Sequence, residues 1–397
     1  MNRLKRSRAG KAIRHWVCRA ELIAESSRPT GWSSGLDILV APDMKKLLPV
    51  LLAFAASLAA ASKIVGGPFT VNVTARSATV VWIVQSNELI LQPPGGVEGR
   101  YSPSFQVEKT TLTGLQPGTP YSYELPGYPG VKGSFRTAAA AAVPYRFLVY
   151  GDTRTRHAVH RHVVEAILKD GIPDFAIQSG DMVENGEDSS LWPIYFDIEK
   201  DLLRQIAFFP VLGNHERNTR DFYQFFQATT PYYSFNWGNA HFMAINSDIA
   251  NSAANKPARD AFWAEQTKWL EDQLAGSQSV EYRIVVAHHP PFSAVSSRQG
   301  ANPEMRALVP MFEKYHVSIA FFGHDHNYQR NLQNGINYVI SGGGGAPLYD
   351  VDKPDPATSQ KAVSVENFVT VSVNGKVMKI QAKGLDGTIL DQFEVRH

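Results

Sequence analysis

The chain has 397 residues, of which 44% are hydrophobic and 19% charged, and its formal net charge is +2. This length and composition are ordinary for a folded protein with one large domain and one smaller one. The positive charge is concentrated in residues 1–61, which hold 10 Lys+Arg and 4 Asp+Glu, so residues 62–397 hold 29 and 33. The body of the chain therefore has no basic bias, and its charge gives no support to nucleic-acid binding.

Residues 44–61 have the layout of a secretory signal peptide. Met44-Lys45-Lys46 is followed by a short apolar run and then by small residues up to Ala61. The run contains Pro49 and is shorter than the ~20 residues that a membrane-spanning helix needs, although a membrane anchor remains the alternative. We expect a secreted or periplasmic protein with no transmembrane segment in the mature chain.

Residues 1–43 are Arg-rich and contain no pattern typical of a folded element. We interpret them as a mis-assigned or disordered extension, with translation starting at Met44. The only cysteine, Cys18, lies in this extension, so the exported protein would have neither a disulfide nor a thiolate metal ligand.

Residues 64–137 predict a small all-β unit. A strand is expected at 78–84, a second β segment at 112–125 and a closing strand at 135–137, followed by an alanine-rich linker at 138–144. The pattern Leu-x-Pro-x-Thr-x-Tyr-x-Tyr from Leu115 to Tyr123 resembles the tyrosine corner of fibronectin type III sandwiches, where a Tyr hydroxyl ties a strand to the preceding turn. Trp82 would be the core tryptophan of such a sandwich. These aromatic residues are expected to pack rather than to catalyse.

From Tyr145 onward, apolar strand patterns alternate with helical patterns. Strands are expected at 146–150, 175–179, 208–212, 240–246, 283–287 and 317–322, and helices at 158–169, 192–206 and 259–274. The glycine-rich turn 341–345 precedes further strands at 367–380 and 389–395. The alternation predicts a layered sheet with helices outside, and ligands of such folds gather beyond the carboxyl ends of the strands.

Polar donors follow five of the apolar runs. The five segments are Tyr150-Gly151-Asp152, Gly180-Asp181, Gly213-Asn214-His215-Glu216, Val285-Val286-Ala287-His288-His289 and Gly323-His324-Asp325-His326. Each segment taken singly is also typical of a turn or a capped loop. Together they offer oxygen and imidazole donors without a thiolate, which suits Fe, Mn or Zn. The donors are too many for one tetrahedral ion, and they suit two ions ~3.5–4 Å apart that share a bridging carboxylate.

The order of these segments resembles the calcineurin-like metallophosphoesterase superfamily, whose motifs are Asp-x-His, Gly-Asp, Gly-Asn-His-Asp/Glu, His and Gly-His-x-His. With the preceding fibronectin type III-like domain at 64–137, the chain resembles the purple acid phosphatase branch. The resemblance implies an α/β fold, a four-layer α-β-β-α metallophosphoesterase sandwich over residues 145–397, preceded by the small all-β sandwich. The cofactor it implies is a pair of metal ions, Fe, Mn or Zn.

The resemblance also implies a role for each matching residue. Asp152 and His326 would bind the first metal, Asp181 would bridge the two, and the second metal would be held by Asn214, His288 and His324. His215 would act as general acid, and Glu216 would orient the His215 imidazole. The implied reaction is hydrolysis of phosphate monoesters by attack of a metal-bound hydroxide on phosphorus.

Two positions depart from the family patterns. Arg154 replaces the metal-binding His of the superfamily, and Glu184 stands where purple acid phosphatases have a Tyr, so no purple colour is expected. Glu184 either replaces the missing metal ligand or caps the loop 183–186. Arg154 and Arg156 are interpreted as receptors for substrate phosphate, or alternatively as residues of a solvated loop.

His289 is expected to contact the substrate or to support a metal ligand, because adjacent residues of a strand point to opposite sides and His288 is the proposed ligand. The expected partner is a small-molecule phosphoester.

Two other functions remain open at this point. The same site would serve a phosphodiesterase or nucleotidase. The departures at Arg154 and Glu184 also leave room for a non-catalytic binding protein with a degenerate first metal site.

Overall fold

The computed structural model describes residues 49–51, 63–91, 101–140, 143–300 and 302–397. The predicted extension 1–43 and most of the predicted signal peptide lie outside these ranges. Within that peptide, β1 (Pro49–Leu51) pairs in parallel with β5 (Pro120–Glu124). In the described part of the chain, no helix combines the length and the apolar character that a membrane crossing requires.

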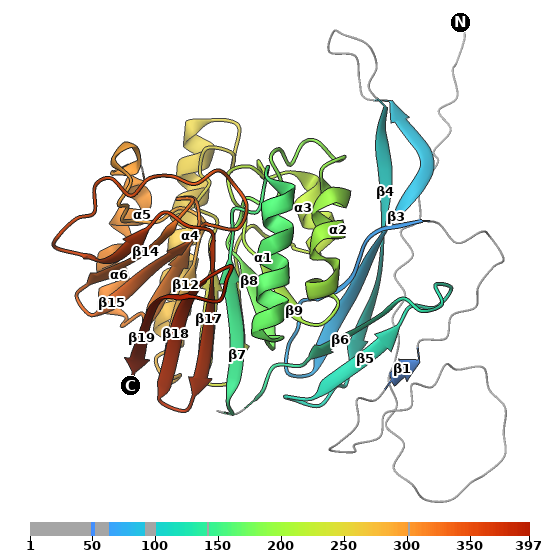
Figure 1. The fold of residues 1–397 in the computed structure, drawn as a ribbon, viewed down its shortest axis with the longest axis horizontal. Helices are drawn as coiled ribbons and strands as arrows, with labels where there is room; N and C mark the ends of the chain where they lie inside the picture. Colours follow the sequence, from blue (N-terminus) through green and yellow to red (C-terminus); the bar gives the residue numbers. More distant parts are fainter. Residues whose placement is uncertain (1–48, 52–62, 92–100, 141–142, 301) are drawn as a thin grey trace, which may run out of the picture.

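One sheet of the fold has nine strands, in the order β19-β18-β17-β7-β8-β9-β2-β3-β4 (Figure 1). Its parallel centre consists of β7 (Tyr145–Tyr150), β8 (Phe175–Gln178) and β9 (Ala207–Pro210). On one side the sheet continues through the antiparallel strands β17 (Asn367–Asn374), β18 (Val377–Gly384) and β19 (Ile389–Arg396). The predicted carboxyl-terminal strands thus complete this sheet, as expected.

A second sheet has seven strands. They are, in sheet order, β10 (Tyr233–Trp237), β11 (Ala240–Ala244), β12 (Tyr282–Val286), β13 (Ile319–Phe322), β15 (Ile336–Ser341), β14 (Tyr328–Gln333) and β16 (Ser359–Val363). The four strands β11, β12, β13 and β15 run parallel to one another. The ends of β12 and β13 therefore lie at the same edge of the sheet.

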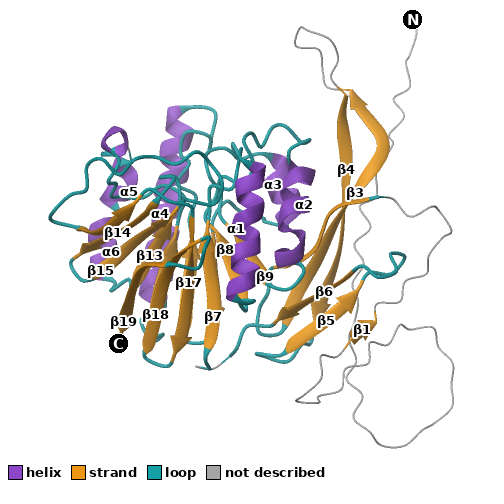
Figure 2. Ribbon diagram, viewed as in Figure 1, coloured by secondary structure: helices purple, strands orange, loops and turns teal. Residues whose placement is uncertain are grey.

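Three hydrophobic cores separate the layers. One lies between the two sheets and contains Phe147 and Phe175 from the first with Phe242 and Phe321 from the second. The other two cores lie outside the sheets, beneath the flanking helices (Figure 2). The first sheet is covered by α1 (His157–Asp170), α2 (Trp192–Leu203) and α3 (Arg220–Phe226), and the second by α4 (Lys256–Gly276), α5 (Pro303–Ala307) and α6 (Val309–Lys314). This α-β-β-α arrangement confirms the fold predicted for the catalytic part.

The expected β unit forms, but backbone pairing joins it to the catalytic part. It contains β2 (Ile64–Val71), β3 (Ser77–Leu91), β4 (Tyr101–Thr113), β5 and β6 (Lys132–Arg136). As the tyrosine-corner pattern predicts, the Tyr121 hydroxyl accepts a hydrogen bond of 2.9 Å from the Gln116 amide, and Trp82 is buried. However, β2 pairs with β9 through Thr70 and Ala207, so β2–β4 extend the nine-stranded sheet. A separate fibronectin type III-like sandwich therefore stays a prediction.

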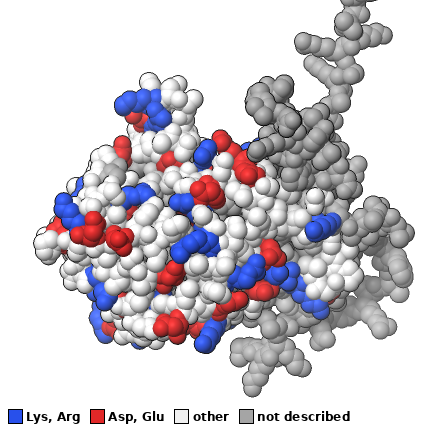
Figure 3. Space-filling model, turned by 45° about the horizontal axis from the view of Figure 1, so that its top comes forward, with Lys and Arg blue, Asp and Glu red and all other residues white. Residues whose placement is uncertain are grey.

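Charged side chains of both signs are interspersed on the molecular face in Figure 3. Lys and Arg do not gather there into one basic surface. This distribution agrees with the balanced charge of residues 62–397.

Candidate metal centre

The predicted donors come together in tight turns just beyond the ends of the strands. Asp152, Asp181 and His324 have φ angles of 59°, 57° and 68°, in the left-handed region that non-glycine residues rarely adopt. The glycines beside them are required by close approach. A Cβ on Gly213 would lie 2.3 Å from Asp181 Oδ1, and one on Gly323 would lie 2.5 Å from Asp152 Oδ2. The Gly-donor pairs seen in the sequence thus allow the loops to approach the carboxylates.

The donors form two adjacent clusters. In one, ligand atoms of Asp152, Asp181 and His326 lie within 4.8 Å of one another, and in the other those of His288, His289 and His324 do the same. Asn214 joins the second cluster, since its Oδ1 lies 3.1 Å from His288 Nε2 and 3.2 Å from His324 Nδ1.

Asp181 connects the two clusters. Its Oδ1 lies 3.3 Å from His288 Nε2, although its carboxylate belongs to the cluster of Asp152 and His326. The His-x-His segment is correspondingly divided, with His326 in the first cluster and His324 in the second. One carboxylate between two donor groups is the arrangement that a bridged pair of ions requires.

Two of the imidazoles are oriented as metal-binding histidines usually are. The Nδ1 atoms of His288 and His326 lie 2.8 Å and 2.6 Å from the carbonyl oxygens of Ser179 and Pro347. Because a carbonyl only accepts, each Nδ1 carries a proton, and Nε2 is the nitrogen that faces the cluster. A backbone carbonyl on the second ring nitrogen is the common support of a ligating histidine, so these residues fit a metal site.

Without a bound ion, the charges of the site favour a proton between His288 and Asp181. Burial alone would lower the pKa of His288, but the Asp181 charge prevails and raises this pKa to about 10. Burial likewise works to raise the pKa of Asp181, yet the charge of His288 holds it below its ordinary value. The pair is thus an imidazolium and a carboxylate until an ion replaces the shared proton.

His215 lies beside this centre and is partly exposed. Its Nδ1 donates to the Glu184 carbonyl oxygen over 2.6 Å, and its Nε2 lies 3.8 Å from Asp181 Oδ2. The ring therefore turns its second nitrogen toward the bridging carboxylate. This position agrees with the predicted role of a proton donor near a bound substrate.

Glu216 does not orient the His215 ring, which corrects the sequence prediction. Its buried carboxylate accepts three backbone N–H bonds, from Gly213 at 2.7 Å, Asp181 at 2.9 Å and Met182 at 2.6 Å. Burial, together with the nearby Asp181 charge, raises the pKa of Glu216 to about 7. Glu216 thus holds the loop of Asp181 against the loop that begins at Gly213. The His215 ring is oriented instead by the backbone carbonyl of Glu184.

The two departures from the family pattern pair with each other. The exposed Glu184 carboxylate contacts the Arg154 guanidinium and accepts a 2.6 Å bond from the Thr155 hydroxyl. It lies outside both donor clusters, so the structure gives no support to its predicted role as a ligand. Arg154 also has its Nε 3.5 Å from Asp181 Oδ2, which places a guanidinium at the edge of the centre.

Arg156 is used for structure. Its guanidinium donates to the carbonyl oxygens of Gly345 at 2.8 Å and Ala346 at 2.7 Å and to the Glu366 carboxylate at 3.1 Å. These bonds hold the glycine-rich turn in place. The predicted contact of Arg156 with phosphate is therefore not supported, because these donors are already used.

His289 lies closer to the centre than expected. The rule that neighbours point to opposite faces applies to a regular strand, but β12 ends at Val286. Beyond that residue His288 and His289 turn to the same side, and the His289 ring centroid is 4.1 Å from that of His324. The Ser247 hydroxyl lies 2.9 Å from His289 Nδ1, and burial, with the nearby His288 charge, lowers the pKa of His289 to about 3.

Two residues at the centre were missed by the sequence analysis. Arg298 contacts His324, and the Tyr349 ring stacks on His326 with centroids 4.2 Å apart. Arg298 ends a single 3₁₀ turn and Tyr349 lies in a loop, and neither segment carries a recognisable motif that would have singled these residues out in the sequence.

Comparison with known proteins agrees with this geometry. Residues 145–328 match the family model of the calcineurin-like phosphoesterases. An uncharacterized protein of Mycobacterium tuberculosis is 26% identical over 276 residues, covering 59% of this chain and 52% of the relative. Purple acid phosphatase 15 of Arabidopsis thaliana is 25% identical over 296 residues, covering 60% and 53%. The chain thus spans about half the length of these curated relatives.

Among solved structures, purple acid phosphatase PPD1 from yellow lupin seeds shares the fold. Its TM-score is 0.65 at 17% identity, and the match covers 83% of this chain and 74% of that one. Residues 145–328 are thus similar to the calcineurin-like phosphoesterases, and a purple acid phosphatase is among the relatives that the chain resembles.

Proposed function

We propose that this protein is a binuclear metal-dependent phosphoesterase that hydrolyses phosphate monoesters in the manner of an acid phosphatase. The observation that carries the proposal is the position of Asp181. It belongs to one donor cluster with Asp152 and His326, and its Oδ1 also lies 3.3 Å from His288 of the other.

The proposed ligands follow from the two clusters. Asp152, Asp181 and His326 would hold one ion, and Asp181, Asn214, His288 and His324 the other. His289, the third imidazole of the second cluster, would keep its predicted role of contacting the substrate or supporting a metal ligand. Carboxylate, amide and imidazole donors without a thiolate suit Fe, Mn or Zn. When bound, two such ions would activate a water molecule and neutralise charge on the phosphoryl oxygens.

His215 would donate the proton that the leaving alkoxide needs. Its Nδ1 proton is bound to the Glu184 carbonyl, so Nε2 carries a second proton only when the ring is an imidazolium. Proton donation from Nε2 therefore requires the charged ring. Positioned acids of this kind contribute roughly 10²–10⁴-fold to a rate.

Metal analysis coupled to a phosphoester panel tests the proposal. The purified, metal-loaded protein should hold two metal ions per chain and should hydrolyse monoesters faster than bis-esters. Preferential turnover of a bis-ester would identify a phosphodiesterase with the same site. Fewer than two ions per chain, with no turnover of any ester, would refute the proposal and identify a binding protein.

The proposed place of action is outside the cytoplasm, in a secreted or periplasmic form. The signal-peptide pattern at 44–61 supports this proposal. A mature amino terminus near residue 62, found by intact-mass measurement of the natural protein, would agree with it. A mature protein that begins before Met44 would contradict it.

We further propose that residues 64–137 are a fibronectin type III-like unit that supports the catalytic sheet.

A further inference from the structure

Arg298 and Tyr349 cover the two histidines of the Gly-His-x-His segment. Arg298 ends the short 3₁₀ helix η1 (Ser296–Arg298), and its guanidinium contacts His324 Nε2. The same guanidinium donates to the Tyr349 hydroxyl over 2.9 Å and lies 4.9 Å from the centroid of the Tyr349 ring. Tyr349 in turn stacks on His326. The Arg298–Tyr349 pair therefore borders both donor clusters.

Within the described ranges, Arg298 is the arginine at this centre that makes no direct salt bridge, and its charge acts on the Asp325 carboxyl only at longer range. Among the described residues, no carboxylate oxygen lies within 4.0 Å of its nitrogens, the distance used for a salt bridge. By contrast, Arg154 pairs with Glu184, and Arg156 pairs with Glu366. An incoming phosphate would therefore meet at Arg298 a guanidinium with no salt bridge to break, unlike the two arginines that the sequence singled out.

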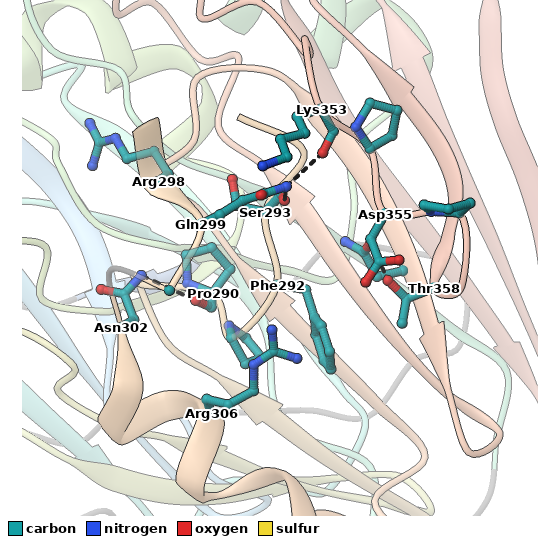
Figure 4. Close-up of a pocket in the computed structure, with 15 residues that line it drawn as sticks. Pro290, Phe292, Ser293, Arg298, Gln299, Asn302, Arg306, Lys353, Asp355 and Thr358 are labelled. Atoms are coloured by element: carbon teal, nitrogen blue, oxygen red, sulfur yellow. Dashed lines mark hydrogen bonds between the residues drawn. The ribbon is translucent and has the colours of Figure 1, made fainter. Parts of the chain in front are cut away.

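The Arg298 side chain also extends toward the centre rather than into the pocket that its loop borders. This pocket of about 320 Å³ is lined by Arg298, Arg306 and Lys353 among others. In Figure 4 Arg298 points away from the other labelled residues, whereas Arg306 extends toward Phe292. The two arginines thus share a neighbourhood, and Arg298 is the one that contacts His324.

Metal binding at His324 would release Arg298 from its present partner. His324 turns Nδ1 toward Asn214 Oδ1 at 3.2 Å and toward His288 Nε2 at 3.3 Å, so Nδ1 is the nitrogen that the second cluster offers to an ion. A neutral imidazole that uses Nδ1 as a donor atom carries its proton on Nε2. Nε2 can then no longer accept a hydrogen bond from Arg298.

We propose that Arg298 binds the phosphoryl group of the substrate when the centre holds its metals. The guanidinium fork, freed from His324, matches two phosphate oxygens and needs no further partner to be displaced. The Tyr349 hydroxyl holds the guanidinium at the border of both clusters meanwhile. This inference rests on the proposed phosphoesterase function and identifies a substrate-binding residue for it.

The test compares Arg298→Gln with Arg306→Gln, a matched control from the same neighbourhood. Calorimetry of metal-loaded protein with inorganic phosphate should show binding weakened roughly tenfold to a hundredfold by Arg298→Gln, in line with the loss of a charge-assisted bidentate contact. Arg298→Lys, which keeps the charge but not the fork, should fall between wild type and Arg298→Gln. Arg306→Gln should bind phosphate as wild type does, and all three variants should keep their metal content.

Two results would overturn the inference. Unchanged phosphate affinity in a fully metal-loaded Arg298→Gln protein would exclude phosphate binding by Arg298. If Arg298→Gln loses metal to an extent that accounts for its weaker phosphate binding, Arg298 only positions His324 and does not bind phosphate. Because phosphate binding is measured without turnover, these results differ from a failure of the proposed function, which would be a loaded wild type that hydrolyses no ester.

Discussion

Removal of the Glu216 carboxylate should destabilise the protein and loosen the metal centre together. The carboxylate accepts three backbone N–H bonds of 2.6–2.9 Å in a site with no solvent exposure. A hydrogen bond to a charged group contributes about 1.5–3 kcal/mol, but the contributions are not additive, and the burial that raises the pKa of Glu216 to about 7 offsets part of them. We therefore expect Glu216→Ala to lower the free energy of unfolding by about 3–6 kcal/mol, with Glu216→Gln losing less because one acceptor remains.

Urea unfolding of chelator-treated protein measures this loss without interference from metal binding. Glu187→Ala is the matched control, since Glu187 is an exposed glutamate whose pair with Arg217 at 3.0 Å lies on the surface. Such a pair contributes about 0–1 kcal/mol, so the control should unfold nearly as wild type does. Metal content measured on the same samples should fall for Glu216→Ala, because the loops that carry Asp181 and Asn214 lose their common anchor.

An opposite outcome would restore the role first predicted for Glu216. Unchanged stability and full metal content in Glu216→Ala, with an altered pH dependence of turnover, would mean that the carboxylate acts through the His215 imidazole. That result would refute the structural reasoning.

Three further changes test other contacts of the centre. His215→Ala should retain both metals while turnover falls by roughly 10²–10⁴-fold, and a parallel loss of metal would contradict its role as proton donor. Glu184→Gln should leave the metal content unchanged because the carboxylate faces Arg154, whereas loss of one ion would make Glu184 a ligand. The pKa of His288 is raised from 6.5 to about 10, so its contribution to metal-free stability is fully present below pH 6.5 and is lost as the pH rises through 10. Urea unfolding in chelator should therefore show lower stability at pH 9 than at pH 6, and a higher stability at pH 9 would refute the assigned ion pair.

The sequence contained enough information to predict the catalytic layers and the convergence of the donors. Ends of neighbouring parallel strands lie at the same edge of a sheet, so the sequence predicts that Asp152, Asp181 and Asn214 lie together after β7, β8 and β9, and that His288 and His324 lie together after β12 and β13. That the two sheets bring these two groups to one centre was implied by the family resemblance. The glycines before the donors give a further local signal, because the turns they occupy leave no space for a Cβ.

The residues that support the metal-binding loops could not be predicted in the same way. Glu216 binds three amides that no strand uses, and which amides remain unpaired depends on how three loops fold against one another. The structural bonds of Arg156 could not be foreseen, because its carbonyl partners, Gly345 and Ala346, are 189 and 190 residues away. Likewise, one residue pair, Thr70 with Ala207, joins the amino-terminal strands to the catalytic sheet, and such a contact leaves no pattern in the sequence.

Asp181 is proposed to link two metal ions in a hydrolytic centre. The most direct test is to measure metal content together with phosphomonoester turnover in Asp181→Ala. Asp197→Ala is the control, since Asp197 pairs with Lys200 on the surface. Wild type and control should hold two ions per chain and turn over fully, whereas Asp181→Ala should lose both metal content and turnover. Full metal-dependent turnover in Asp181→Ala would contradict the proposed link.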